Sequence, residues 1–161
     1  MSIARTQQAL FTPVRMGKLE LRNRIVMAPL TRMRAANSGH APTKLHAEYY
    51  AQRASAGLII GECTEISPDA YGWADTPGLW NAEQVRGWRG VTDAVHNKGS
   101  FMYAQLWHTG AMSHPDFFDG ALLLINRRGD GAQPHRTPAV FFEHCQHDLL
   151  VDFIEAEAVH F

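Results

Sequence analysis

The chain of 161 residues is long enough for one domain with a hydrophobic core and too short for two comfortable ones. Its hydrophobic fraction of 45%, charged fraction of 19% and scattered net charge of −1 are those of a soluble globular protein, and they indicate neither a nucleic-acid nor a membrane partner. Because the sequence has no span-length apolar run, no signal-peptide core and only two cysteines, we expect it in the reducing cytoplasm.

The first predicted elements are a β-hairpin, a buried strand and a helix. Residues 13–23 form the expected hairpin, with Gly17 and Lys18 in its turn. Residues 25–28 are a near-continuous apolar run, which is typical of a parallel strand covered on both faces. Residues 43–57 are predicted to form a helix that Gly57 ends in the C′ position.

The strand and helix pattern then repeats. Residues 57–65 are a second buried strand, and a loop rich in Pro and Gly leads to Asn81, an N-cap residue with Gln84 three positions later. From there to Gly99, apolar residues recur at helical spacing: Val85, Trp88, Val91 and Val95. Residues 100–110 form the third predicted strand.

The remaining sequence completes one expected domain over residues 1–161. We predict a long loop over 111–146 and, over 147–161, the start of a helix that is cut short. Alternating strands and helices imply βαβ crossovers and a parallel sheet, and no G-x-G-x-x-G motif supports an open dinucleotide-binding sheet. We therefore predict an α/β fold, a partial TIM (β/α)8 barrel of about three βα units preceded by an N-terminal β-hairpin.

Polar side chains gather where the predicted strands end, which is where parallel α/β folds bind ligands. The first strand leads to Thr31, the second to Cys63, and the third carries Gln105 followed by Trp107. A Gln side chain can bind a C=O/N–H edge bidentately, and a Thr hydroxyl can donate to a ring carbonyl that gains negative charge. This set predicts a flat heterocyclic ligand with alternating donors and acceptors.

Four segments of the sequence resemble the N-terminal part of a known family: NRIVMAPLTR, EYYAQRASAGLIIGECTEIS, TPGLWNAEQVRGWRGVTDAVHNKG and QLWHTGAMSHP. They are similar, in order and over residues 10–119, to the Old Yellow Enzyme family of FMN-dependent NAD(P)H:enone oxidoreductases, which have a TIM-barrel fold. The resemblance implies FMN as the cofactor, NAD(P)H as the reductant and small activated alkenes such as enones as the substrates.

The resemblance also implies roles for individual residues. Gln105 matches the amide that binds the pyrimidine edge of the flavin, and Thr31 matches the catalytic residue that hydrogen-bonds near flavin C4=O and N5. Three further flavin-contacting positions are Pro29, Leu30 and Cys63. The aromatic positions of the substrate pocket are Trp73 and Trp107.

Several of these residues also have a plain structural explanation, which the sequence leaves open. Gln105 could be a buried amide satisfied by the backbone, and Thr31 could cap a local turn. Trp107 could be a core aromatic at the rim, and Cys63 a small buried hydrophobe. The His-Cys-x-His cluster over residues 144–147 fits no standard zinc spacing, so we predict no metal site.

A second class of function also stays open. The resemblance also implies a substrate-anchoring His-Asn or His-His pair and a Tyr proton donor on later strands, and we find neither within these 161 residues. The alternative is a catalytically incompetent partial barrel that acts as an assembly or binding module. Unpaired sheet edges and an apolar face favour self-association or a chain that completes the sheet. A metal-dependent hydrolase built on the C-terminal histidines is the third alternative.

Overall fold

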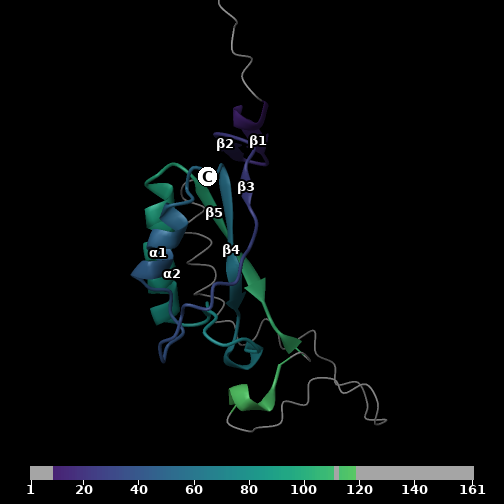
Figure 1. Ribbon diagram of the computed structural model, residues 1–161, viewed down its shortest axis with the longest axis vertical. Coiled ribbons are helices and arrows are strands. Elements are labelled where there is room, and N and C mark those ends of the chain that lie inside the picture. Colours follow the sequence, from purple (N-terminus) through teal and green to yellow (C-terminus); the bar gives the residue numbers. More distant parts are fainter. Residues whose placement is uncertain (1–8, 111–112, 119–161) are drawn as a thin grey trace, which may run out of the picture.

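Three parallel strands form the sheet on which most of the described chain packs (Figure 1). The structure is a computed structural model that describes residues 9–110 and 113–118. The strand order is β3-β4-β5, and an antiparallel pair, β1-β2, precedes it in the chain. The elements are η1 (Ala9–Phe11), β1 (Val14–Met16), β2 (Leu19–Leu21), β3 (Val26–Met27), α1 (Lys44–Ala51), β4 (Leu58–Glu65), η2 (Pro68–Ala70), α2 (Ala82–His96), β5 (Phe101–Trp107) and η4 (Pro115–Phe118).

The N-terminal hairpin is confirmed. Strands β1 and β2 pair antiparallel, and Gly17 between them has a φ of +60°, a conformation that glycine adopts without strain. Leu19 and Leu21 are buried and pack with Leu58 at the start of β4. The hairpin therefore lies at the N-terminal end of the parallel strands, as Figure 1 shows.

Helix α1 begins as predicted but ends earlier. Thr43 and His46 form a reciprocal capping box at its start. The helix ends at Ala51, so the prediction that Gly57 ends it in the C′ position is wrong. Gly57 instead lets two backbone segments approach closely, because a Cβ there would lie 2.4 Å from the backbone oxygen of Asn23.

Helix α2 confirms both its predicted cap and its predicted buried stripe. The Asn81 side chain accepts from the backbone N–H of Gln84, and the Gln84 side chain in turn accepts from the backbone N–H of Asn81. Trp88 is 1% exposed and donates from Nε1 to the carbonyl of Gly78. The core joins both helices to the sheet through Tyr50, Ala54, Ala56, Ile59, Leu79, Val85, Trp88, Val91, Val95 and Met102.

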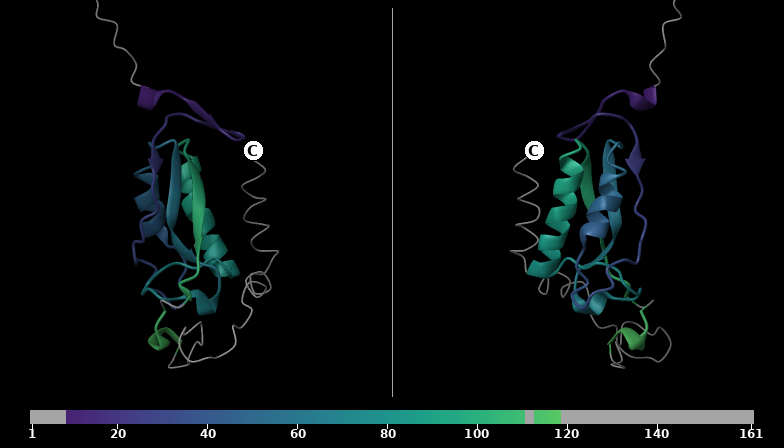
Figure 2. Two further views of the ribbon diagram at one scale, coloured as in Figure 1. Left: turned by 90° about the vertical axis from the view of Figure 1, so that its right-hand side faces the viewer. Right: turned by 60° about the vertical axis from the view of Figure 1, so that its left-hand side comes forward.

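The two described helices cover only one face of the sheet (Figure 2). Along β5, Met102 and Ala104 pack against the helix-bearing core, whereas the alternating Tyr103 is 42% exposed. In β3, Val26 is 46% exposed. The prediction that residues 25–28 are covered on both faces is therefore wrong for the described residues, because α1 and α2 pack on the same side.

The described chain supports part of the predicted architecture. A parallel α/β arrangement with two strand–helix–strand connections follows a hairpin, as expected. Of the predicted loop over 111–146, only residues 113–118 are described, and they include η4; the predicted helix over 147–161 lies outside the described residues. No described helix is both long enough and apolar enough to cross a membrane.

Two glycines in α2 give a matched test of the packing between α2 and the segment before α1. A Cβ on Gly87 would lie 2.5 Å from the backbone oxygen of Pro42, whereas a Cβ on Gly90 would meet nothing within 4 Å. Both alanine variants gain the same helix propensity, about 1 kcal/mol. We expect Gly90→Ala to be neutral or stabilising and Gly87→Ala to lose about 1–3 kcal/mol in urea unfolding. Equal effects would contradict this packing.

Candidate functional site

A β-bulge in β4 decides which side chain stands beside Gln105. Ile60 pairs with Tyr103 and Cys63 pairs with Gln105, so β4 has one residue more than β5 over this stretch. The bulge brings Cys63 level with Gln105, and the thiol donates to Oε1 of the amide across 3.1 Å between Sγ and Oε1. The structure thus joins two of the predicted cofactor-binding residues on adjacent strands.

The Gln105 side chain is half-buried on the face of the sheet that the described helices leave uncovered. It alternates along β5 with Met102 and Ala104, which face the core. In the described part of the chain its amide forms a hydrogen bond with Cys63 and with no backbone group. The alternative that Gln105 is a buried amide satisfied by the backbone is therefore not supported by the described residues. Its NH2 group remains available as a donor and its oxygen keeps a second lone pair. Such an amide can still bind a C=O/N–H edge.

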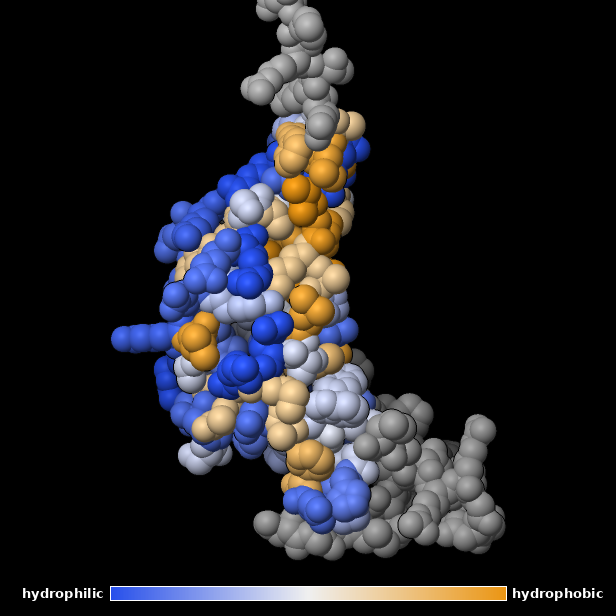
Figure 3. Space-filling model, viewed as in Figure 1, coloured by the Kyte–Doolittle hydropathy of each residue, from blue (hydrophilic) through white to orange (hydrophobic). Residues whose placement is uncertain are grey.

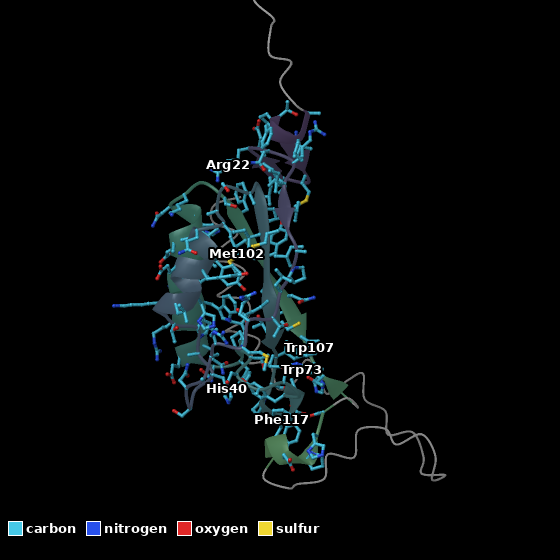
Figure 4. The ribbon with its side chains drawn as sticks, in the orientation of Figure 1. Arg22, His40, Trp73, Met102, Trp107 and Phe117 are labelled. Carbon is cyan, nitrogen blue, oxygen red and sulfur yellow. The ribbon has the colours of Figure 1, made fainter. Side chains whose placement is uncertain are left out.

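The two predicted substrate-pocket aromatics meet at the carboxyl end of the sheet. The ring centroids of Trp73 and Trp107 are 5.9 Å apart, with an interplanar angle of 49° (Figure 4). Trp107 ends β5, and Trp73 comes from the loop between β4 and α2, where it is 45% exposed. Trp107 is therefore a half-buried rim residue with an aromatic partner.

The segment that follows β3 carries the remaining predicted residues. Leu30 is 53% exposed, Pro29 is half-buried, and Thr31 is exposed. Among the described residues the Thr31 hydroxyl has no hydrogen-bond partner, so it caps no described turn, and Thr43 is the cap of α1. The backbone N–H of Arg32 donates to Glu62 Oε2 at 2.9 Å, which ties this segment to β4. The roles of these three residues toward a cofactor remain predictions.

Glu62 is a structural carboxyl group that sequence reasoning missed. It is fully buried, and its Oε1 accepts from the Tyr50 hydroxyl of α1 at 3.1 Å. The same hydroxyl accepts from the Glu62 backbone N–H at 2.8 Å. Burial raises the pKa of Glu62, although the hydrogen bonds from Arg32 and Tyr50 oppose the shift. A carboxylate inside an otherwise apolar strand run was the available signal.

A second buried carboxyl group, Glu65, holds the loop that carries Trp73. Glu65 donates from its backbone N–H to Pro77 and accepts at its backbone oxygen from Leu79, both at 2.9 Å. Its side-chain Oε1 accepts from the Thr76 hydroxyl, which also lies 3.1 Å from the backbone oxygen of Trp73. Oε2 has no partner among the described residues. Burial raises the pKa of Glu65 to about 7, so its charge changes near neutral pH.

No metal site is evident in the described residues. Within residues 9–110 and 113–118, no three His, Cys, Asp or Glu side chains are grouped so that they could hold a metal ion. The His-Cys-x-His cluster over residues 144–147 lies outside the described residues.

Comparison with known protein sequences gives extended matches. Residues 9–149 match the family described as NADH:flavin oxidoreductase / NADH oxidase. A chanoclavine-I aldehyde reductase of Penicillium roqueforti is 51% identical over 152 residues, which cover 91% of this chain and 41% of that protein. The 12-oxophytodienoate reductase 1 of Oryza sativa subsp. japonica is 48% identical over 109 residues, which cover 67% of this chain and 28% of that protein.

Solved structures give similar matches. Morphinone reductase superposes with a TM-score of 0.64 and 52% identity, over 68% of this chain and 29% of that one. The old yellow enzyme homologue of Zymomonas mobilis gives a TM-score of 0.64 and 52% identity, over 68% of this chain and 30% of that one. The chain therefore spans less than half the length of these relatives.

The raised pKa of Glu65 predicts a pH-dependent stability. The folded state retains the Glu65 proton from the ordinary pKa of 4.5 up to about 7, so this group's contribution to the free energy of unfolding is lost as the pH rises through that window. Glu65→Gln cannot ionise, and we expect its unfolding free energy to fall less between about pH 5 and pH 8. Urea unfolding at several pH values measures this. The exposed Glu20→Gln should follow the parent, and parallel curves for parent and Glu65→Gln would contradict the prediction.

Proposed function

The chain belongs to the NADH:flavin oxidoreductase / NADH oxidase family, the family of the old yellow enzyme homologues that it resembles, and we propose that it forms the pyrimidine-edge part of an FMN site in an NADH- or NADPH-dependent oxidoreductase. The observation that carries the proposal is the Gln105 amide, held beside Cys63 on the uncovered face at the carboxyl end of the sheet. The chain spans less than half the length of its relatives, and we therefore also propose, rather than infer from their names, that the whole protein is an oxidoreductase.

The chemistry of the Gln105 side chain fits a flavin. The pyrimidine edge of isoalloxazine alternates carbonyl oxygens with an N–H group, and a primary amide offers both a donor and an acceptor. The Cys63 thiol donates to the amide oxygen, so it favours one orientation of the amide and directs the NH2 group away from β4. A fixed amide loses less freedom on binding than a mobile one.

The other predicted residues would complete the proposed site. When bound, FMN would carry hydride from NAD(P)H to an activated alkene such as an enone. The exposed Thr31 hydroxyl is available to donate to a ring carbonyl that gains negative charge, and Pro29 and Leu30 offer apolar contacts beside it. Trp73 and Trp107 would provide an aromatic wall for the alkene.

A second candidate function, an assembly module, is supported by the uncovered face. Val26 and Tyr103 are 46% and 42% exposed, and β3 and β5 are both edges of the described sheet. Figure 3 shows apolar side chains gathered along the side of the molecule that carries the hairpin and β3. Such a face with open edges favours self-association or a chain that completes the sheet.

A flavin titration tests the first function. We expect the purified chain to quench the fluorescence of added FMN with a saturable curve, and Gln105→Ala to bind FMN about tenfold more weakly because its hydrogen bonds to the ring are lost. The exposed Gln52→Ala, at the end of α1, is the matched control and should bind like the parent. No saturable binding by the parent, or equal binding by both variants, would argue against the proposed site.

Light scattering tests the second function. If the uncovered face assembles, the parent chain is larger than a monomer and Tyr103→Lys shifts it toward the monomer, because burying a lysine in an apolar contact is costly. Leu45→Lys, an equally drastic change at an exposed residue of α1, should leave the assembly intact. A monomeric parent that binds FMN stoichiometrically would exclude the assembly function.

A further inference from the structure

A small cavity lies on the helix-bearing side of the sheet, between α1 and the segment that follows β3. Its volume is about 100 Å³. The residues that line it are Arg32, Arg34, Leu45, His46, Tyr49 and Glu62. Gln105 and Cys63 belong to the opposite face and do not line it, so the cavity is separate from the proposed flavin-contacting residues.

His46 presents a buried hydrogen-bond donor without an acceptor. The side chain is 2% exposed, and its Nδ1 accepts from the backbone N–H of Thr43 at 3.0 Å. Burial lowers the pKa of His46, so the ring is neutral and carries its one proton on Nε2. Nε2 has no partner among the described residues. A buried N–H without an acceptor is rare in folded proteins and indicates a missing partner.

Two arginines, both exposed, line the same cavity: Arg32 and Arg34. The Arg32 guanidinium lies 4.7 Å from the centroid of the Tyr49 ring, and among the described residues Arg34 donates only to the backbone oxygens of Arg32 and Met33. Met33 has a φ of +53°, a left-handed turn between the two arginines. In the described part of the chain neither guanidinium forms an ion pair with a carboxylate.

The carboxyl group of Glu62 is not an ion-pair partner of the two arginines. Its two oxygens already accept from the Tyr50 hydroxyl and from the backbone N–H of Arg32. Two arginines and a single carboxyl group therefore line the cavity, so that the charges of its lining residues are positive in sum.

We propose that this cavity binds one small oxyanion of the phosphate or carboxylate class, held by the Nε2–H of His46 and the guanidinium groups of Arg32 and Arg34. The ion accepts the hydrogen bond that His46 lacks and forms charge-assisted bonds with the arginines. A volume of about 100 Å³ accommodates a single phosphate or carboxylate group and not a nucleotide.

Calorimetric titration of the intact chain tests the proposal. The probes are inorganic phosphate, acetate and glycerol phosphate, each at an ionic strength held constant with sodium chloride. We expect saturable binding of phosphate or acetate. Binding of glycerol phosphate as well would identify the terminal group of a metabolite as the source, and its failure to bind would identify a free ion. No saturable binding of any of the three would overturn the proposal.

Variants of Arg34 test whether the anion binds in this cavity or is attracted only by the overall charge of the protein. Arg34→Gln should weaken binding at least about tenfold because one charge-assisted contact is lost, while Arg34→Lys keeps the charge and should bind more tightly than Arg34→Gln. The matched control is Arg89→Gln, which removes the same charge from an exposed position of α2 and should leave binding unchanged. Equal losses in Arg34→Gln and Arg89→Gln would overturn the proposal.

The ring of His46 gives a readout that is independent of affinity. In NMR spectra of the labelled protein, the Nε2–H signal of His46 should shift as the anion saturates the site. Saturating riboflavin, which has the flavin ring but no phosphate, should not displace the anion, because Gln105 lies on the other face of the sheet. An unmoved His46 signal, or displacement of phosphate by riboflavin, would overturn this site without bearing on whether FMN binds to Gln105.

Discussion

The buried carboxyl group of Glu62 is the constraint on which much of the described structure depends. A carboxyl group with no exposed surface must be hydrogen-bonded or protonated, because an unpaired buried charge is very costly. Its partners come from two other places in the chain, the Tyr50 hydroxyl of α1 and the backbone N–H of Arg32. Satisfying this one group therefore fixes α1 and the segment after β3 against β4.

Neighbouring residues of β4 serve opposite faces of the sheet, because side chains alternate along a strand. Glu62 bonds to α1 on the helix-bearing side, while the next residue, Cys63, lies level with Gln105 on the uncovered side. This alternation separates the group that holds the structure together from the pair that is available to a ligand, and the inserted residue of the bulge sets Cys63 level with Gln105. The same division separates the donor-lined cavity under α1 from the proposed flavin-contacting residues.

The two faces of the sheet differ in what they contribute. The helix-bearing face carries the core around Trp88 and supplies the hydrophobic stabilisation of the described chain. The other face presents Tyr103 and Gln105 without a described element over it. Glu65 contributes both to the folded structure and to the candidate site. Its buried carboxyl group anchors the loop that places Trp73 beside Trp107.

Much of the fold was predictable because it follows local rules. The turn at Gly17, the capping box at Asn81 and the buried stripe of α2 depend on residues a few positions apart, and the structure has them as predicted. The early end of α1 could not be predicted from the position of Gly57. That glycine is required by its close contact with Asn23, a residue distant in the sequence, and not by the end of the helix.

The sequence by itself determined the parallel α/β pattern and which residue types stand at the strand ends. Only the tertiary structure decided their neighbours: Cys63 beside Gln105, which is 42 positions away, Trp73 beside Trp107, and Tyr50 on Glu62. A one-residue bulge shifts the register of everything beyond it, and although Gly61 marks a place where β4 can bulge, the sequence of β4 does not say which residue of β5 then lies beside Cys63. Contacts between distant residues depend on that register, and for this reason the candidate sites became visible only in the folded chain.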